Sequence, residues 1–120
     1  MDTQCVCTPI VIAMIEHRQA VEHVEEILTV RGLDAIMIGP YDLSASLGMP
    51  GHFETTQFMA TLGRIAAVAD RHHVPCGIHV VMPDPEVLHQ RMAEGYRFLA
   101  YGMDAVLLHT MRLARHAEQP

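Results

Sequence analysis

The chain has 120 residues, of which 50% are hydrophobic and 18% are charged, and its formal net charge is −6. This composition excludes a disordered tail and a basic nucleic-acid-binding surface, and the length allows one domain at most. All eight basic side chains other than histidine are arginines. The chain therefore supplies neither a Schiff-base lysine nor a phosphate-binding loop that ends in Gly-Lys.

The cysteine count and the N-terminal residues indicate a cytoplasmic protein. Three cysteines form no repeated framework, which is typical of a reduced compartment. No secretory signal is expected, because Asp2 replaces a basic start, and the apolar run at 9–15 is too short to span a membrane. We therefore expect no membrane and no nucleic acid among the partners.

Short apolar runs alternate with helical periodicities along the first half of the chain. Residues 10–15 are apolar and rich in β-branched side chains, which predicts a strand buried on both faces. Residues 18–30 carry apolar side chains at helical spacing, and Gly32 is expected as the C-cap. Residues 35–38 predict a second buried strand, and 42–48 predict a short helical turn.

The second half continues the alternation with two strands and three helices. Asp84 is expected to cap the middle helix of this half, because an aspartate side chain can accept hydrogen bonds from the first backbone amides. The elements are expected at 53–73 (helix), 77–81 (strand), 85–94 (helix), 98–101 (strand) and 105–116 (helix).

This βαβαβαβα order predicts four parallel strands joined by right-handed crossovers within one domain, residues 1–120. An open flavodoxin-like sheet is one solution, although Glu-His-Arg, and no glycine-rich phosphate turn, follows the first strand at 16–18. The other solution is a TIM (β/α)8 barrel of about 250 residues, of which four βα units are half. Such a half exposes two sheet edges, so we expect oligomerisation or a partner half to complete it.

Acidic residues directly follow the first two predicted strands. In parallel α/β folds, ligands bind at the carboxyl ends of the strands, where Glu16 and Asp42 stand. Adjacent strands lie about 4.8 Å apart, so the two carboxylates could converge on one hard divalent cation. Taken singly, each acid is better explained as a charge at a helix N-terminus or as a loop cap. The pair is the stronger signal, because both acids follow buried apolar strands.

The loop at 39–48 and one histidine are the other candidate site residues. Gly39 allows the backbone to approach a ligand, and successive amides entering a helical turn can hold a small carboxylate. Ser44 either takes part in this site or caps the turn. His79 ends the third strand, where it contacts substrate or relays a proton, or else is a hydrogen-bonded structural histidine.

Several segments resemble the HpcH/HpaI aldolase family: Met-Ile-Glu at 14–16, the run at 32–48, Gly-Ile-His at 77–79 and the run at 95–104. The most specific part is Gly-Pro-X-Asp-Leu-Ser at 39–44. The resemblance covers nearly the whole chain and matches the C-terminal half of the family's (β/α)8 barrel. It implies a metal-dependent lyase that reversibly cleaves 4-hydroxy-2-oxo acids to pyruvate and an aldehyde through a metal-stabilised enolate.

The resemblance also implies roles for individual residues. Glu16 and Asp42 would hold Mg²⁺, Mn²⁺ or Co²⁺, and the backbone amides of Tyr41 and Asp42 would hold the pyruvate carboxylate. The family's general-base histidine and enolate-stabilising arginine belong to the preceding half of the barrel, so no catalytic residue is assigned in this chain. The candidate substrate-binding residues are Gly39, Pro40, Tyr41, Asp42, Ser44 and His79.

Two functions remain open at this point. The chain is part of a class II aldolase that acts once a homo-oligomer or a complementary N-terminal half-barrel completes it. Alternatively, it is a non-catalytic half-barrel or a truncated fragment that binds metal and 2-oxo acid or only oligomerises. The absence of lysine agrees with the metal-dependent route, because the other aldolase route needs a Schiff-base lysine.

Overall fold

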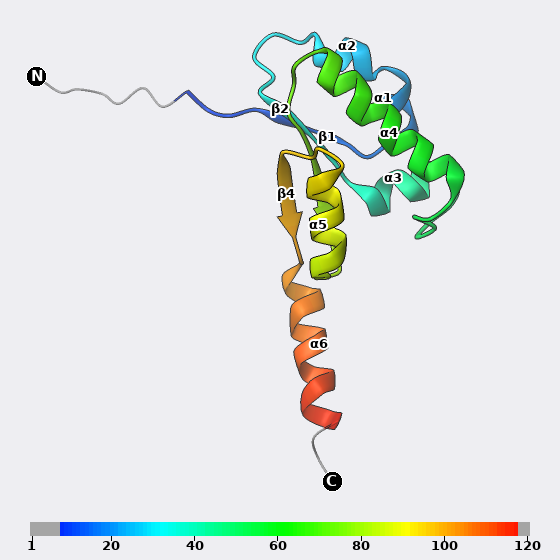
Figure 1. Cartoon of the computed structure of the whole chain (residues 1–120), viewed down its shortest axis with the longest axis vertical. Helices are drawn as coiled ribbons and strands as arrows, with labels where there is room; N and C mark the ends of the chain where they lie inside the picture. Colours follow the sequence, from blue (N-terminus) through cyan, green and yellow to red (C-terminus); the bar gives the residue numbers. More distant parts are fainter. Residues whose placement is uncertain (1–7, 118–120) are drawn as a thin grey trace, which may run out of the picture.

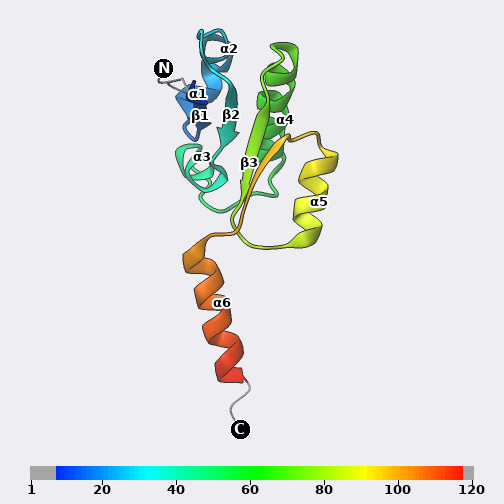
Figure 2. The ribbon, with the colours of Figure 1, turned by 90° about the vertical axis from the view of Figure 1, so that its left-hand side faces the viewer.

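A single parallel sheet organises the chain in the computed structural model, which describes residues 8–117. The strand order is β1-β2-β3-β4, the same as the order in the sequence. Figure 2 shows β1, β2 and β3 side by side in this order. Sequential parallel strands with right-handed crossovers place their connecting helices on one face of the sheet. The part of the chain described here therefore does not form a doubly wound, flavodoxin-like sheet. The strands are β1 (Ile12–Ile15), β2 (Ala35–Ile38), β3 (Cys76–Val80) and β4 (Phe98–Tyr101).

The helices lie where the sequence periodicity predicts them, but one is divided and others have different ends. The helix expected at 18–30 is divided at His23 into two short helices, so the prediction of one continuous helix was wrong. The long helix begins later than expected because Thr55 caps it, with Oγ1 accepting from the Phe58 amide at 3.2 Å. The helices are α1 (Arg18–Glu22), α2 (Val24–Leu28), α3 (Pro40–Ser46), α4 (Thr56–Arg71), α5 (Pro85–Ala93) and α6 (Asp104–Ala117).

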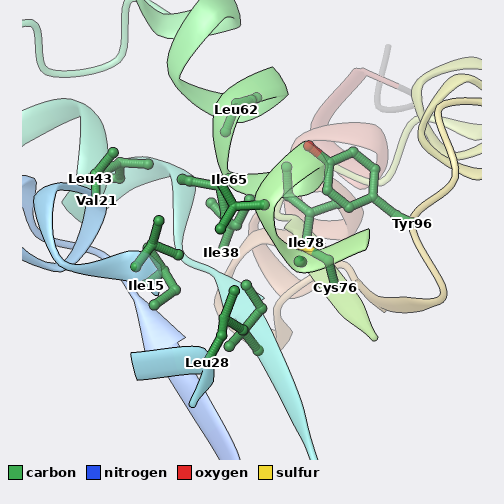
Figure 3. Packing of buried hydrophobic residues seen from close by; sticks show 14 of the residues in the cluster. Ile15, Val21, Leu28, Ile38, Leu43, Leu62, Ile65, Cys76, Ile78 and Tyr96 are labelled. Carbon is green, nitrogen blue, oxygen red and sulfur yellow. The ribbon is translucent and has the colours of Figure 1, made fainter. Parts of the chain in front are cut away.

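The core lies between the sheet and helices α1 to α4. Ile15, Ile38 and Ile78 project from three neighbouring strands toward this side, and each is buried (Figure 3). Leu62 and Ile65 of α4 pack against them (Figure 3). Because side chains alternate along a strand, the residues directly before and after each of these isoleucines point to the opposite face of the sheet.

The opposite face of the sheet is open. Ile12 is 39% exposed, Met14 48% and Phe98 37%, although all three are large apolar side chains of the sheet. The expectation that the first strand is buried on both faces was therefore wrong, because no element within residues 8–117 covers this face. We call it the open face below.

Gly77 shows how closely β3 and β4 pack together on the open face. A Cβ at Gly77 would lie 2.5 Å from the carbonyl oxygen of Phe98 and 2.7 Å from Cδ1 of its ring. Gly77 and Phe98 are paired in the register of β3 and β4. The Phe98 ring therefore occupies the space above residue 77, which only glycine leaves free.

Helix α6 points away from the rest of the chain in both views (Figures 1 and 2). Its side chains Leu107, Leu108 and Met111 are exposed. No helix within residues 8–117 is both long and apolar enough to cross a membrane.

Candidate functional site

The strand register brings three residues side by side at the carboxyl end of the sheet. Ile15 pairs with Ile38, so the residues that follow them, Glu16 and Gly39, are neighbours, and the Gly39 amide donates to the Ile15 carbonyl at 3.2 Å. One step beyond the pairing of Ile38 with Ile78, Gly39 stands beside His79. Paired residues of parallel strands point to the same face, so Glu16 and His79 flank Gly39 on the open face.

The Glu16 side chain lies across the backbone of Gly39. A Cβ at residue 39 would stand 3.3 Å from Glu16 Cβ, 3.3 Å from Glu16 Oε2 and 3.3 Å from Met14 Cε. The φ of Gly39 is −94°, which any residue can adopt, so glycine is needed here for close approach and not for backbone conformation. The missing side chain leaves the Glu16 carboxylate beside the start of α3.

Helix α3 carries the second predicted metal ligand in its first turn. Gly39 is its N-cap and Pro40 its first residue. Proline is favoured at this position because an N–H there would have no acceptor within the helix. The amides of Tyr41 and Asp42 belong to the same turn, where N–H groups have no acceptor within the helix. Asp42 and these two amides therefore belong to the first turn of the helix beside whose start Glu16 lies.

The two carboxylates are exposed and have no charged partner among the described residues. Glu16 and Asp42 make neither an ion pair nor a side-chain hydrogen bond with any residue of the described chain. Within residues 8–117, no group of three or more histidine, cysteine, aspartate or glutamate side chains could hold a metal ion. A cation bound here would take its remaining ligands from water or substrate, and its binding by both acids stays a prediction.

Ser44 supports the loop from within. Its side chain is fully buried, and its hydroxyl donates to the Tyr41 carbonyl at 2.7 Å and accepts from the Gly51 amide at 3.0 Å. These two bonds hold the first turn of α3 against the loop that follows the helix. Both hydrogen bonds of this hydroxyl are made within the protein. A contact between Ser44 and substrate stays a prediction.

Ser46 makes a link that the sequence did not suggest. Its hydroxyl accepts from the Arg18 amide at 3.0 Å and donates to the Leu43 carbonyl at 2.8 Å. It therefore ties α3 to the start of α1, the helix that follows Glu16. The two segments are 28 residues apart in the sequence, so no local pattern could have revealed the bond.

Tyr41 forms one wall of a cavity of about 550 Å³. Its ring meets Phe53 edge-on, with centroids 4.8 Å apart and planes at 71°. The wall continues through Phe58, whose ring centroid lies 5.6 Å from that of Phe53. Sequence reasoning missed Phe53, although an aromatic residue just before the long helix is a signal for packing against the preceding loop.

His79 is held by a backbone carbonyl. Its Nε2 lies 2.9 Å from the carbonyl oxygen of Gly102, the residue after β4, and the side chain is half-buried. This is the hydrogen bond that a structural histidine would make. A contact between His79 and substrate stays a prediction.

A larger cavity, of about 840 Å³, lies at the opposite ends of the strands around Cys76 and Tyr96. Burial raises the pKa of the Cys76 thiol to about 12. Burial, followed by the nearby Cys76, also raises the pKa of Tyr96 to about 12. Both groups stay protonated at neutral pH, so this cavity offers neither a thiolate nor a phenolate.

A family model described as HpcH/HpaI aldolase/citrate lyase matches residues 6–110. The chain belongs to the HpcH/HpaI aldolase/citrate lyase family. The family resemblance noted in the sequence is thus confirmed. The matched range includes every candidate site residue described above.

Among the curated relatives that the chain resembles are proteins named as aldolases. The chain is 36% identical over 107 residues to the hydroxypyruvate/pyruvate aldolase of Sagittula stellata, covering 89% of this chain and 42% of the relative. It is 37% identical over 99 residues to a 2-keto-3-deoxy-L-rhamnonate aldolase of Escherichia coli, covering 80% and 35%. The chain therefore spans less than half the length of these relatives.

Solved structures of family members have the same fold over the matched part. An HpcH/HpaI aldolase from Desulfitobacterium hafniense superposes with a TM-score of 0.81 at 31% identity, covering 92% of this chain and 44% of that one. The citrate lyase beta subunit from M. tuberculosis, complexed with oxaloacetate and magnesium, superposes with a TM-score of 0.63, covering 92% and 53%. At 20% identity, this second likeness is one of fold.

Proposed function

We propose that this chain is the C-terminal half of a class II aldolase, which reversibly cleaves 4-hydroxy-2-oxo acids to pyruvate and an aldehyde. The observation that carries the proposal is the contact of the Glu16 side chain with Gly39 at the start of α3. Asp42 and two amides without helical acceptors stand in the same turn. The aldolase names of the curated relatives support this reaction class.

The donor set of this turn fits a hard divalent cation. Glu16 and Asp42 are exposed carboxylates, and the space left by Gly39 keeps the first of them at the helix start. Mg²⁺, Mn²⁺ and Co²⁺ are the candidates, and a fold relative is complexed with oxaloacetate and magnesium. When bound, such an ion supplies a Lewis acid that draws electron density from the oxygens of a 2-oxo acid.

The chain's own groups would bind and orient the acid. The amides of Tyr41 and Asp42 donate to its carboxylate, which the positive end of the short helix also favours. Ser44 holds the Tyr41 carbonyl and thereby fixes the direction of this turn. The Tyr41 ring packs edge-on against Phe53, which restricts the direction of the Tyr41 side chain beside this turn.

We further propose that a second half-barrel covers the open face. Ile12, Met14 and Phe98 would then become core residues of a closed (β/α)8 barrel. The occupant is a complementary N-terminal half or a second copy of this chain. It would supply the general base and the arginine that the family resemblance places in the preceding half. Until it does so, we expect binding without turnover.

A non-catalytic role in binding metal and 2-oxo acid is the second candidate. The reason for this candidate is that the general base and the arginine implied by the family resemblance lie in the preceding half of the barrel, so the described residues are assigned neither role. Pyruvate release from a 4-hydroxy-2-oxo acid by the completed protein would distinguish the two functions.

Calorimetric titration with Mg²⁺ or Mn²⁺ and then pyruvate tests the binding of metal and 2-oxo acid, which both candidate functions require. We expect metal-dependent pyruvate binding that Glu16→Gln abolishes. Glu86→Gln, which changes an exposed acid in the first turn of α5, is the matched control and should bind normally. Absent binding in the natural chain, or unchanged binding in Glu16→Gln, would refute the site.

A further inference from the structure

The imidazole of His79 has one nitrogen whose protonation is set by the backbone. Nε2 lies 2.9 Å from the Gly102 carbonyl oxygen, and a carbonyl oxygen can only accept a hydrogen bond. Nε2 therefore carries the hydrogen and donates. In the neutral ring, Nδ1 is then an unprotonated acceptor with a fixed direction.

This second nitrogen is accessible to a ligand. Nδ1 of His79 has no hydrogen-bond partner among residues 8–117. Within the same range, no buried side-chain nitrogen or oxygen lacks a partner. Nδ1 must therefore be in contact with solvent, although the side chain as a whole is half-buried.

His79 also stands in the row that contains the candidate metal ligand. Glu16 is on one side of Gly39 and His79 on the other, so about 10 Å, or two strand spacings, separates their backbones. Gly39 contributes no side chain to this row, and the atoms nearest to its missing Cβ are Cβ and Oε2 of Glu16 and Cε of Met14, each at 3.3 Å. A 2-oxo acid whose carboxylate is held at the start of α3 reaches the imidazole along this row when the flexible Met14 side chain turns aside.

We propose that His79 determines specificity for hydroxylated substrates. Its Nδ1 accepts a hydrogen bond from the 4-hydroxyl group of a 4-hydroxy-2-oxo acid. A 2-oxo acid without this hydroxyl leaves Nδ1 to water. One neutral hydrogen bond of this kind corresponds to a preference of about three- to tenfold in affinity. The inference rests on the proposed function, because that function places the 2-oxo acid end of the ligand.

Two ligands that differ only in the hydroxyl test this inference. The full chain is titrated at pH 8 in Mg²⁺ with 4-hydroxy-2-oxopentanoate or with 2-oxopentanoate. Long-range ¹H–¹⁵N spectra of the imidazoles report which nitrogen of His79 is protonated and whether Nδ1 responds. Amide signals of Gly39 and Asp42 report binding at the metal end independently.

We expect an unprotonated Nδ1 that shifts with the hydroxylated ligand alone, and about three- to tenfold tighter binding of that ligand. His79→Gln keeps a donor for Gly102 but removes Nδ1, so in this variant the two ligands should bind with equal affinity. His89→Gln, at an exposed histidine of α5, should retain the preference.

The possible failures are distinguishable. If both ligands shift the Gly39 and Asp42 amides with equal affinity, or if Nδ1 carries the proton in the free protein, the role of His79 is refuted and the proposed function stands. If neither ligand shifts those amides in Mg²⁺, the proposed function is refuted and the role of His79 with it.

Discussion

Oε2 of Glu16 lies 3.3 Å from the point where a side chain at Gly39 would begin. The carboxylate and a Cβ at residue 39 therefore compete for one place. Gly39→Ala should push the Glu16 side chain away by a few tenths of an ångström and so weaken divalent-cation binding by about tenfold, as changes that disturb the orientation of metal ligands commonly do. Calorimetric titration with Mn²⁺ measures the change.

Gly63→Ala is the matched control for this substitution. A Cβ there meets nothing within 4 Å, and Gly63 lies inside α4. It should stabilise the fold by about 0.5–1 kcal/mol, because alanine restricts the unfolded chain and favours helix. Unchanged Mn²⁺ affinity in Gly39→Ala would show that Glu16 does not bind the ion from this position.

A side chain at residue 77 should damage the sheet itself. In Gly77→Ala the new Cβ would lie 2.5 Å from the Phe98 carbonyl oxygen, which belongs to the backbone and cannot turn aside. We expect a loss of about 3 kcal/mol in the free energy of unfolding, toward the upper end of the range for overpacking. Urea denaturation measures it, and a loss below about 0.5 kcal/mol would contradict the close contact of β3 and β4.

Removal of the Ser44 hydroxyl should loosen the loop around α3. Ser44→Ala leaves the Gly51 amide and the Tyr41 carbonyl without a buried partner, at a cost of about 1–3 kcal/mol. It should also weaken pyruvate binding, because the Tyr41 amide shares the same turn. Thr61→Ala, whose hydroxyl bonds only to Gln57 in its own helix, should have little effect on either quantity.

The buried thiol makes stability depend on pH in the alkaline range. The unfolded chain releases the Cys76 proton near an ordinary pKa of 9.0, whereas burial raises the folded pKa to about 12. The unfolded state therefore binds fewer protons between these values, and the free energy of unfolding falls as pH rises. The contribution is fully present below pH 9 and declines by at most about 1.4 kcal/mol per pH unit above it.

Urea denaturation at a series of pH values from 8 to 11 checks this dependence. Cys76→Ala should reduce the slope, and the part that remains reflects Tyr96, whose pKa is raised in the same direction. Cys5 and Cys7 lie outside the described residues. Both are replaced by serine in the two proteins that are compared, the one with Cys76 and the one with Cys76→Ala. An unchanged slope in Cys76→Ala would contradict burial as the cause.

Local patterns in the sequence predicted most elements but not how their faces are covered. The strands at 35–38 and 98–101 and the Asp84 cap are confirmed, because each depends on neighbouring residues alone. The burial of Met14 was predicted wrongly, since it depends on whether a distant segment covers the open face. Periodicity likewise gave no sign of the break at His23.

The candidate site was likewise predictable from the sequence only in part. The glycine at 39 suggested that the backbone approaches a ligand closely, whereas its contact with the Glu16 side chain became visible only in the structure. The bond from His79 to Gly102 spans 23 residues and becomes visible only once β3 and β4 are paired. The role of Ser44 as a buried brace also required the structure, because its hydroxyl meets Gly51 seven residues later.

Paramagnetic broadening by Mn²⁺ in ¹H–¹⁵N spectra of the full chain tests the central claim most directly, since it locates the ion residue by residue. We predict that the amide signals of Gly39, Tyr41 and Asp42 broaden first, while those of Cys76 and Tyr96 at the other end of the sheet persist. Pyruvate should then shift the Tyr41 and Asp42 amides in diamagnetic Mg²⁺. Broadening that is absent, centred elsewhere or unchanged in Glu16→Gln would contradict a metal-dependent 2-oxo acid site at this turn.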